Sequence, residues 1–369
     1  MNAEIISSNL KTIRSRKKIT QQQLSELSGV SLPTIKLIER KKGLPKTNTL
    51  LALSKGLNCK LQDLVQQQEE LSAVRFRIKK TLKRRQEILS IVSQWLDDYT
   101  FLEEELTDRE DYKLQELSNS TKNFSPKEYA EKARQIIGLK NNEPIHNICG
   151  LLESCGIKIL ALPYSSDVFN GLSVGKTNKG PAIIINTWEK ITTERQIFSA
   201  AHELGHLLMH LSDYNGNNNF EEIVAEQEAN LFAGYFLLPQ QGFDSEWIET
   251  AGMPLVDRVL KIKTIFKVSY KAVLYRLLEK GIVDDTIWFR FNQLYRAKYN
   301  KKLAFKEEPN LERSEPFGLI PFHFYADRLS RLVRKALEQE IITLSRAAEI
   351  LKLSTQQMMD RVVEWESFH

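Results

Sequence analysis

The sequence predicts a multidomain, mainly α-helical protein with one small region of β-sheet. Apolar residues recur at helical spacing along most of the 369 residues. Short β-branched runs bounded by Gly or Pro occur at residues 157–162, 171–174 and 182–185. A polar stretch after residue 66 and a proline-containing loop at 309–321 mark boundaries. We therefore expect an all-α bundle over 1–66, a helical connector over 67–125, an α+β core over 126–285 and a helical region over 286–369.

Composition excludes several classes of protein. A hydrophobic content of 42% and a charged content of 27% are typical of soluble globular domains. No apolar run reaches membrane length, and the first residues do not form a signal peptide. Cys59, Cys149 and Cys155 are odd in number and widely spaced, which argues against a disulfide framework. We expect a cytoplasmic protein without membrane contact, in which Cys149 and Cys155 are core residues and not metal ligands.

Residues 1–66 contain the pattern of two short helices joined by a tight turn. Thr20 begins the first helix with capping-box spacing to a glutamine, and Gly29 ends it. Ser31 begins the second helix. The expected core positions of the pair are Leu24, Leu27, Ile35 and Ile38. This layout predicts a helix-turn-helix bundle.

The charge of this segment favours a nucleic-acid partner. Residues 1–66 hold twelve Lys or Arg and four Asp or Glu, a net charge of +8, whereas the whole chain carries +5. The remaining residues are therefore slightly acidic. A basic excess confined to the helix-turn-helix is what phosphate binding requires, although a solvated basic face would give the same composition.

The amino-terminal pattern resembles the XRE/Cro-type helix-turn-helix family over about 55 residues, from Thr20-Gln21 through Gly29-Val30-Ser31 to Pro45. The resemblance implies that Gln21 caps the first helix and contacts phosphate. It also implies that the second helix enters the major groove of a double-stranded operator, which a homodimer would read as a near-palindrome. The residues expected to contact DNA are Gln21, Leu32, Pro33, Thr34, Lys36 and Arg40.

Residues 67–125 predict a long helical connector. Seven Lys or Arg fall between residues 75 and 85, and apolar residues follow at helical spacing. A packing or dimerisation helix is favoured over a second DNA contact, because charge runs more often form solvated faces.

The most informative stretch is His202-Glu-Leu-Gly-His206. It lies in an apolar run that predicts a helix, with capping-box spacing from Thr193 to Gln196. Two histidines four residues apart share one face of a helix, so both imidazoles can reach one metal ion. Glu203 lies beside them, where it can act as a general base on water. The pattern predicts the working part of a zinc hydrolase.

A zinc site needs a third protein ligand and one open position. His210 is about 12 Å of helix rise from His202, too far to converge with both other histidines. We expect it near the helix C-terminus, where a partly cationic ring is favourable. A second helical run over 220–233 follows an expected turn at 213–219 and offers Glu226, with Glu228 as the alternative ligand. Small residues in that run, Ala225 and Ala229, would let it pack closely on the first helix.

These segments resemble the ImmA/IrrE family of metallopeptidases. The match runs through Gly180–Asn186, Glu194–His206, Glu226-x-x-Ala229-Asn230 and Leu237-Leu238-Pro239. The resemblance implies a zincin-like core over roughly residues 125–285, with Zn²⁺ held by His202, His206 and Glu226 and with Glu203 as the catalytic carboxylate. Family members of this kind cleave or inactivate repressor proteins.

Two further regions complete the prediction. The three strands are expected to form a small antiparallel sheet beside the metal helices, whose edge could pair with a peptide substrate. Helices over 256–266 and 268–278 resemble the extension that follows this core in relatives. A helix-turn-helix-like pattern beginning at Thr343 lacks a dense basic helix, so packing or protein contact is the favoured role.

The functional hypothesis is a DNA-binding transcriptional regulator with a fused zinc endopeptidase domain that cleaves a regulator protein, either a partner or itself. The alternative is a repressor or antitoxin-like DNA-binding protein whose zinc site is structural or sensory. A plain transcription factor, with an incidental histidine pair, is the third reading. The presence of Glu203 favours the first, because a structural zinc site needs no such carboxylate.

Overall fold

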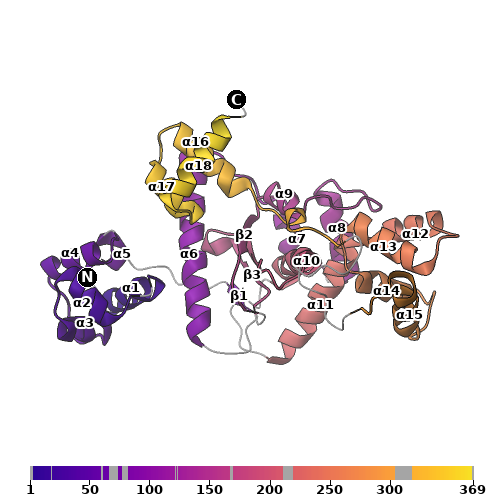
Figure 1. The fold of residues 1–369 in the computed structure, drawn as a ribbon, viewed down its shortest axis with the longest axis horizontal. Coiled ribbons are helices and arrows are strands. Elements are labelled where there is room, and N and C mark those ends of the chain that lie inside the picture. Colours follow the sequence, from indigo (N-terminus) through magenta and orange to yellow (C-terminus); the bar gives the residue numbers. More distant parts are fainter. Residues whose placement is uncertain are drawn as a thin grey trace. The chain divides into compact units, whose positions relative to one another are not determined.

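The computed structural model describes residues 3–17, 19–59, 61–65, 74–76, 82–120, 122, 124–166, 169–210, 219–303 and 318–367. The chain forms two compact units (Figure 1). Unit 1 contains Met1–Ser72 and Lys80–Gln94, and unit 2 contains Ala73–Lys79 and Trp95–His369. Residues 213–218 of the expected turn and 309–317 of the expected loop lie outside the described residues.

Unit 1 contains the predicted helix-turn-helix. Its helices are α1 (Ala3–Arg16), α2 (Gln21–Ser28), α3 (Leu32–Glu39), α4 (Thr47–Gly56) and α5 (Leu61–Val65). Thr20 and Gln23 form the expected capping box of α2, and Gly29 ends that helix with φ 70°. Ser31 caps α3. Burial of apolar side chains from all five helices holds the bundle together, and the buried set is Ile6, Leu10, Ile13, Leu24, Ile35, Ile38, Leu50, Leu53, Leu57 and Leu64.

One expected core position of this bundle is wrong. Leu27 is 61% exposed, whereas Leu24 is fully buried. Helix α2 is only 8 residues long and buries Leu24 alone, so Leu27 lies outside its contact with α3 and α4.

The connector is helical over α6 (Leu82–Glu105), but it also contains a strand, β1 (Val74–Phe76). The side chains of the basic run at 75–84 lie outside the described set. Further along α6, Trp95, Tyr99 and Leu102 are buried in unit 2.

Unit 2 is built on a mixed sheet of β1, β2 (Lys158–Leu162), β3 (Gly171–Val174) and β4 (Ala182–Asn186). The strand order is β1-β3-β4-β2. The expectation of an antiparallel sheet is only partly met, because β2 and β4 pair in parallel while β3 is antiparallel to both β4 and β1. The β3–β4 hairpin reverses the chain and returns β4 between β3 and β2, in the direction of β2.

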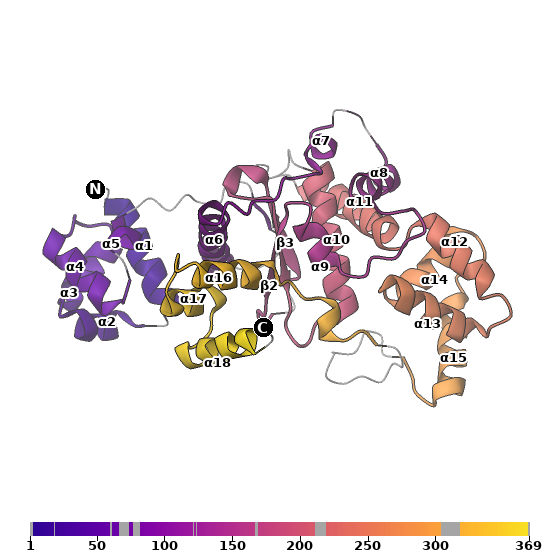
Figure 2. The same ribbon diagram turned by 90° about the horizontal axis from the view of Figure 1, so that it is seen from above.

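Two helices carry the motifs found in the sequence. Helix α10 (Thr193–Met209) packs on β3 and β4 and also on α11 (Asn219–Leu237), so it lies between the sheet and α11 (Figure 2). Close packing of α10 on α11 depends on small residues. A Cβ on Gly205 would lie 3.3 Å from Ala229 Cα and 3.0 Å from Phe232 Cδ1. This agrees with the expectation that Ala229 permits close approach.

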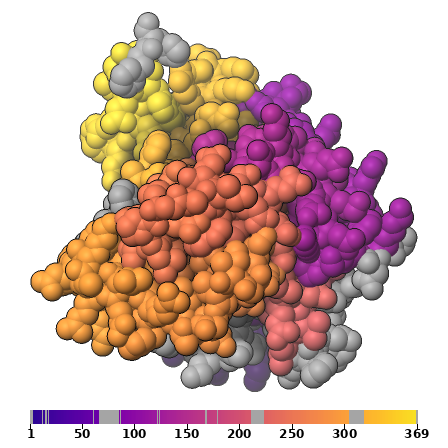
Figure 3. Space-filling model, turned by 90° about the vertical axis from the view of Figure 1, so that its right-hand side faces the viewer, coloured from indigo at the N-terminus to yellow at the C-terminus, as the bar shows by residue number. Residues whose placement is uncertain are grey.

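Further helices surround this core. On one side lie α7 (Gln115–Ser118), α8 (Pro126–Ile136) and α9 (Ile148–Glu153). The helices that follow α11 are α12 (Gln240–Glu249), α13 (Leu255–Phe266), α14 (Tyr270–Glu279) and α15 (Ile287–Tyr299). In orange tones they form most of the near surface in Figure 3. The chain continues through α16 (Arg328–Glu338), α17 (Leu344–Leu351) and α18 (Thr355–Glu366).

A buried ionic network joins α6, β2 and α16. Glu103 accepts hydrogen bonds from Arg328 Nη1 at 2.6 Å and forms an ion pair with Lys158 Nζ at 3.1 Å. Arg328 also donates to Tyr99 Oη and to the Asp108 carbonyl. Each buried charge is compensated, which its burial requires.

The carboxyl-terminal helices repeat the layout predicted from Thr343. Thr343 caps α17, Lys352 ends it in the left-handed region, and Ser354 opens α18 with a capping box. Helix α18 carries Asp360, Glu364 and Glu366 against one arginine, so it lacks the basic face of a DNA-reading helix. None of the described helices is long and apolar enough to cross a membrane.

Candidate metal centre and DNA-binding helix

Helix α10 begins one residue earlier than its capping pattern suggested. Thr192 is the N-cap, and its hydroxyl accepts from the Arg195 amide at 3.3 Å. Thr193 is the first helical residue and is fully buried, so its predicted role as the cap is wrong. Two adjacent threonines offer the same cap chemistry, and Gln196 donates to the Ile191 carbonyl instead of returning to Thr193.

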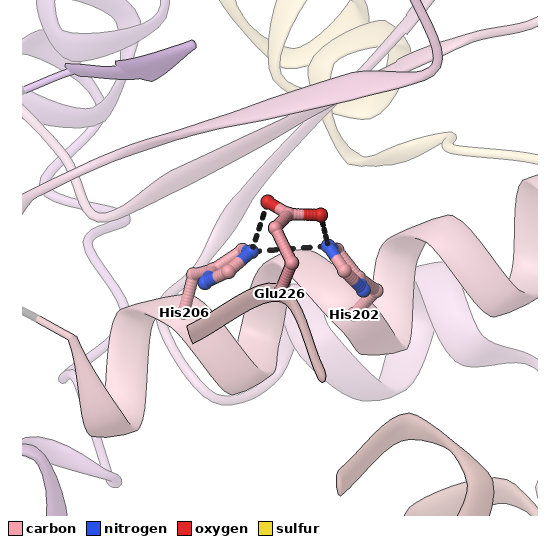
Figure 4. A group of neighbouring side chains, drawn as sticks. All are labelled: His202, His206 and Glu226. Carbon is pink, nitrogen blue, oxygen red and sulfur yellow. Dashed lines mark hydrogen bonds and ion pairs between the residues drawn. The ribbon is translucent and has the colours of Figure 1, made fainter. Parts of the chain in front are cut away.

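The structure brings His202, His206 and Glu226 together (Figure 4). The two imidazoles project from one face of α10, and the carboxylate reaches them from α11. The Nε2 atoms of His202 and His206 are 3.0 Å apart. The Glu226 oxygens lie 3.5 Å from His202 Nε2 and 3.3 Å from His206 Nε2. Both histidines are buried.

This geometry fits a zinc ion. Imidazole nitrogen and carboxylate oxygen bind zinc at about 2.0–2.1 Å, so two ligand atoms of a tetrahedral site lie about 3.3 Å apart. The three observed separations span 3.0–3.5 Å. Within the described ranges the group contains three donors and no fourth. Three protein ligands leave one position for water or substrate, as in catalytic zinc sites.

A side chain outside the metal group orients His202. Its Nδ1 lies 3.0 Å from Asn230 Oδ1. When Asn230 Oδ1 faces the ring it can only accept, so His202 Nδ1 carries the hydrogen. The lone pair of His202 is then on Nε2, the atom that faces Glu226. The same pattern orients ligating histidines in metal sites generally.

His206 is oriented by a longer chain of contacts. Its Nδ1 lies 3.0 Å from His210 Nδ1, and His210 Nε2 lies 2.8 Å from Glu228 Oε2. The Glu228 carboxylate accepts from His210 Nε2–H, so a neutral His210 accepts at Nδ1 from His206. The lone pair of His206 is thereby placed on Nε2, toward the metal group.

These contacts place His210 and Glu228, the two residues considered as alternative ligands, outside the metal group. His210 is the C-cap residue of α10, as expected, and it is buried beside His206. Glu228 contacts His210 and does not join the metal group. Cys149 and Cys155 are buried free thiols outside this group. Burial raises the pKa of both thiols.

Glu203 is held against the sheet. Its Oε2 accepts a hydrogen bond of 2.8 Å from the hydroxyl of Ser173, in the middle of β3. Both residues are buried. A Cβ on Gly171 would lie 3.3 Å from Glu203 Cγ, so the absence of a side chain there leaves room for this carboxylate. The contact orients Glu203 from the strand β3, on which α10 packs.

The charge of Glu226 matches its place in the site. Burial raises the pKa of its carboxyl, but the contacts with His202 and His206 outweigh burial and leave that pKa well below the usual range. The carboxyl is therefore ionised at neutral pH, which a metal ligand must be.

Sequence reasoning missed three contributors to this site. Asn230 belongs to the Glu226-x-x-Ala229-Asn230 pattern, so a signal for it was present. The His210–Glu228 contact depends on how two helices cross, and Ser173 depends on sheet packing. Neither has a local signal in the sequence.

The second candidate site is the outer face of α3. Pro33, Lys36, Leu37 and Arg40 are exposed and lie at helical spacing on one face, opposite the buried Ile35 and Ile38. Leu32 and Thr34 are half-buried, and Thr34 contacts the capping Ser31 through its hydroxyl. The face combines two cations with two apolar side chains, which suits phosphate contact and thymine methyl contact.

Gln21 does not have its predicted capping role. Thr20 is the N-cap of α2, and Gln21 is the first helical residue. Its amide donates to Glu39 Oε2 at 2.7 Å, and Glu39 is also paired with Arg14. The amide of Gln21 is thus directed at the C-terminal end of α3, which ties the two helices together.

Comparisons with known protein families match the two regions of the chain that carry these residues. The family model of the IrrE N-terminal-like domain matches residues 152–278, and a helix-turn-helix family model matches residues 10–64. A search of curated proteins finds no match. The chain therefore joins an amino-terminal XRE-type helix-turn-helix DNA-binding domain to an IrrE/ImmA-like metallopeptidase domain.

Proposed function

We propose that this protein is a transcriptional regulator that binds operator DNA and uses a zinc endopeptidase site to cleave a regulator protein. The observation that carries the proposal is the convergence, among the residues that the structure describes, of three donor atoms from His202, His206 and Glu226, with the buried carboxylate of Glu203 beside them on α10. A structural zinc site would require a fourth protein ligand.

Each side chain has a definite role in this proposal. His202, His206 and Glu226 hold the ion, and Asn230 and the His210–Glu228 pair fix the two imidazoles in the orientation that binding requires. When bound, zinc would act as a Lewis acid that activates water and polarises a peptide carbonyl.

Glu203 is the proposed general base. It accepts a proton from the attacking water and delivers it to the leaving amine. Ser173 donates to one carboxylate oxygen, which holds Glu203 in place beside the metal ligands on α10.

The helix-turn-helix is the domain proposed to recognise the operator. We propose that α3 enters the major groove, with Lys36 and Arg40 on phosphates and Leu32, Pro33 and Thr34 nearest the base edges. A homodimer in the cytoplasm would place two copies of α3 on a near-palindromic operator. Cleavage of a bound or partner regulator would then change transcription at that site.

The decisive experiment uses Glu203→Gln in the full chain. The variant should retain one zinc per chain and lose cleavage of partner regulators encoded near the gene, or of the chain itself. Loss of DNA binding on chelation, with no cleavage by the wild type, would instead identify a sensory or structural zinc site. Absence of stoichiometric zinc in the wild type would refute both readings.

A further inference from the structure

The strand β1 occupies an unexpected place in the sheet. Residues 73–79 belong to unit 2, although the segments on both sides of them, up to Ser72 and from Lys80, belong to unit 1. Within this short excursion, Val74–Phe76 pairs antiparallel with β3 and forms the outer strand of the sheet. Without it, β3 would be the edge strand.

The edge that β1 covers is the one next to the proposed catalytic carboxylate. Arg75 lies opposite Ser173 in the strand register, and Ser173 donates the hydrogen bond that holds Glu203. Phe76 and Val74 lie opposite Leu172 and Val174. The backbone of β1 therefore runs one strand away from the residue that contacts Glu203.

An exposed strand edge is a general docking site for extended peptides, because its unpaired N–H and C=O groups form a ready ladder. A peptidase must hold the backbone of its substrate in extended form close to its general base. In this sheet the position beside β3 is at an edge and is next to the residue that contacts Glu203. The strand β1 of the connector occupies that position.

We propose that β1 occupies, in cis, the position that the backbone of an extended peptide substrate takes beside β3. That the docked peptide is a substrate rests on the proposed function, but the docking of a peptide strand on β3 does not require catalysis. A tethered strand has an effective concentration on the order of mM when its linker is short. A peptide in trans must therefore displace β1 before it can bind.

The test uses the zinc-loaded full chain carrying Glu203→Gln, so that no cleavage obscures binding. Successive amides of a strand point in opposite directions. Val74→Pro together with Arg75→Pro therefore removes one amide that faces β3, whichever way the strand is turned. The matched control, Val74→Ala with Arg75→Ala, keeps both amides. Exchange of the β3 amides with deuterium should accelerate in the proline variant only.

The probe is a fluorescein-labelled peptide with the sequence of residues 73–79. Measured by anisotropy, it should bind the proline variant at least roughly 10-fold more tightly than the alanine control, because the cis competitor is gone. The same peptide methylated on the amides that correspond to Val74 and Arg75 should not bind, although its charge is unchanged.

A second measurement tests whether the proline variant is folded. Protection of the α10 amides from exchange should be retained, which would exclude misfolding. On the chain with native β1, saturating peptide should accelerate exchange of the amides at 74–76. Equal peptide affinity for the two variants, or β3 exchange that the prolines leave unchanged, would overturn the proposal. Neither outcome depends on whether Glu203 is catalytic, so the docking of β1 and the peptidase activity are tested separately.

Discussion

The contact chain from Glu228 through His210 to His206 predicts that two residues outside the metal group control zinc affinity. Glu228→Gln removes the charge that keeps the hydrogen of His210 on Nε2, and His210→Phe removes the acceptor for His206 Nδ1. In both variants the lone pair of His206 is no longer held toward Glu226, so zinc should bind more weakly.

The magnitudes follow from exposure. Loss of a partner of this kind costs roughly 10- to 100-fold in metal affinity. The side chain of Glu228 is 41% exposed, so solvent screens its charge and Glu228→Gln should fall near the lower end. The side chain of His210 is only 7% exposed. Its replacement removes the acceptor of a buried N–H of His206, which costs about 1–3 kcal/mol and places His210→Phe near the upper end.

The assay is competition for zinc against a chromogenic chelator of known affinity. Glu249→Gln is the matched control, because Glu249 is an exposed carboxylate on α12. It should leave the zinc affinity unchanged. Zinc affinities of both Glu228→Gln and His210→Phe within about twofold of the wild type would refute the assigned role, since 1.4 kcal/mol corresponds to a factor of ten.

Three further outcomes are expected. Lys36→Ala should weaken binding to DNA of any sequence and lower by about 1 the slope of log affinity against log salt concentration. Lys55→Ala on α4 should leave both unchanged. Equal slopes for the two variants in salt titrations would contradict a groove contact by α3. In thermal unfolding, Gly205→Ala should destabilise by about 1–3 kcal/mol because its Cβ meets α11, while Gly234→Ala, with open space, should be neutral or stabilising by up to about 1 kcal/mol. Burial and the nearby Asp327 carboxylate raise the pKa of Glu153 to about 8. Its folded state favours the protonated form, so stability should fall as pH rises from the ordinary carboxyl pKa toward 8, by at most about 1.4 kcal/mol per unit. Denaturant titrations of Glu153→Gln should lose this slope, and an unchanged slope would exclude Glu153 as its source.

The sequence predicted what depends on local periodicity. Spacing of four residues places His202 and His206 on one face of a helix, and the structure shows both side chains there. The helix pair of the helix-turn-helix followed from the cap at Thr20 and the turn at Gly29, which are also local signals.

What the sequence missed depends on contacts between distant segments. The direction of β2 relative to β4 is set by the return path of a hairpin, which periodicity within a strand does not record. The same holds for Ser173, whose strand pattern identifies a buried position but not its partner Glu203. For Leu27 the local pattern predicted a core position that the structure does not have. Its apolar side chain is at core spacing but is exposed, because the short helix α2 has no neighbouring helix, among those described, at that point.

The buried network of Glu103, Arg328 and Lys158 has a consequence for how this protein can be divided or recombined. Only Lys158 lies within the segment that matches the peptidase family, whereas its counter-charge Glu103 and the Arg328 that also pairs with Glu103 lie outside that segment. A fragment cut at the family boundaries would lose the carboxylate that compensates the Lys158 ammonium, and removing one partner of a buried ion pair costs about 3–5 kcal/mol. The folding unit is therefore larger than the segment that the family model matches. A transplant of the peptidase into another regulator would have to bring α6 and α16 with it.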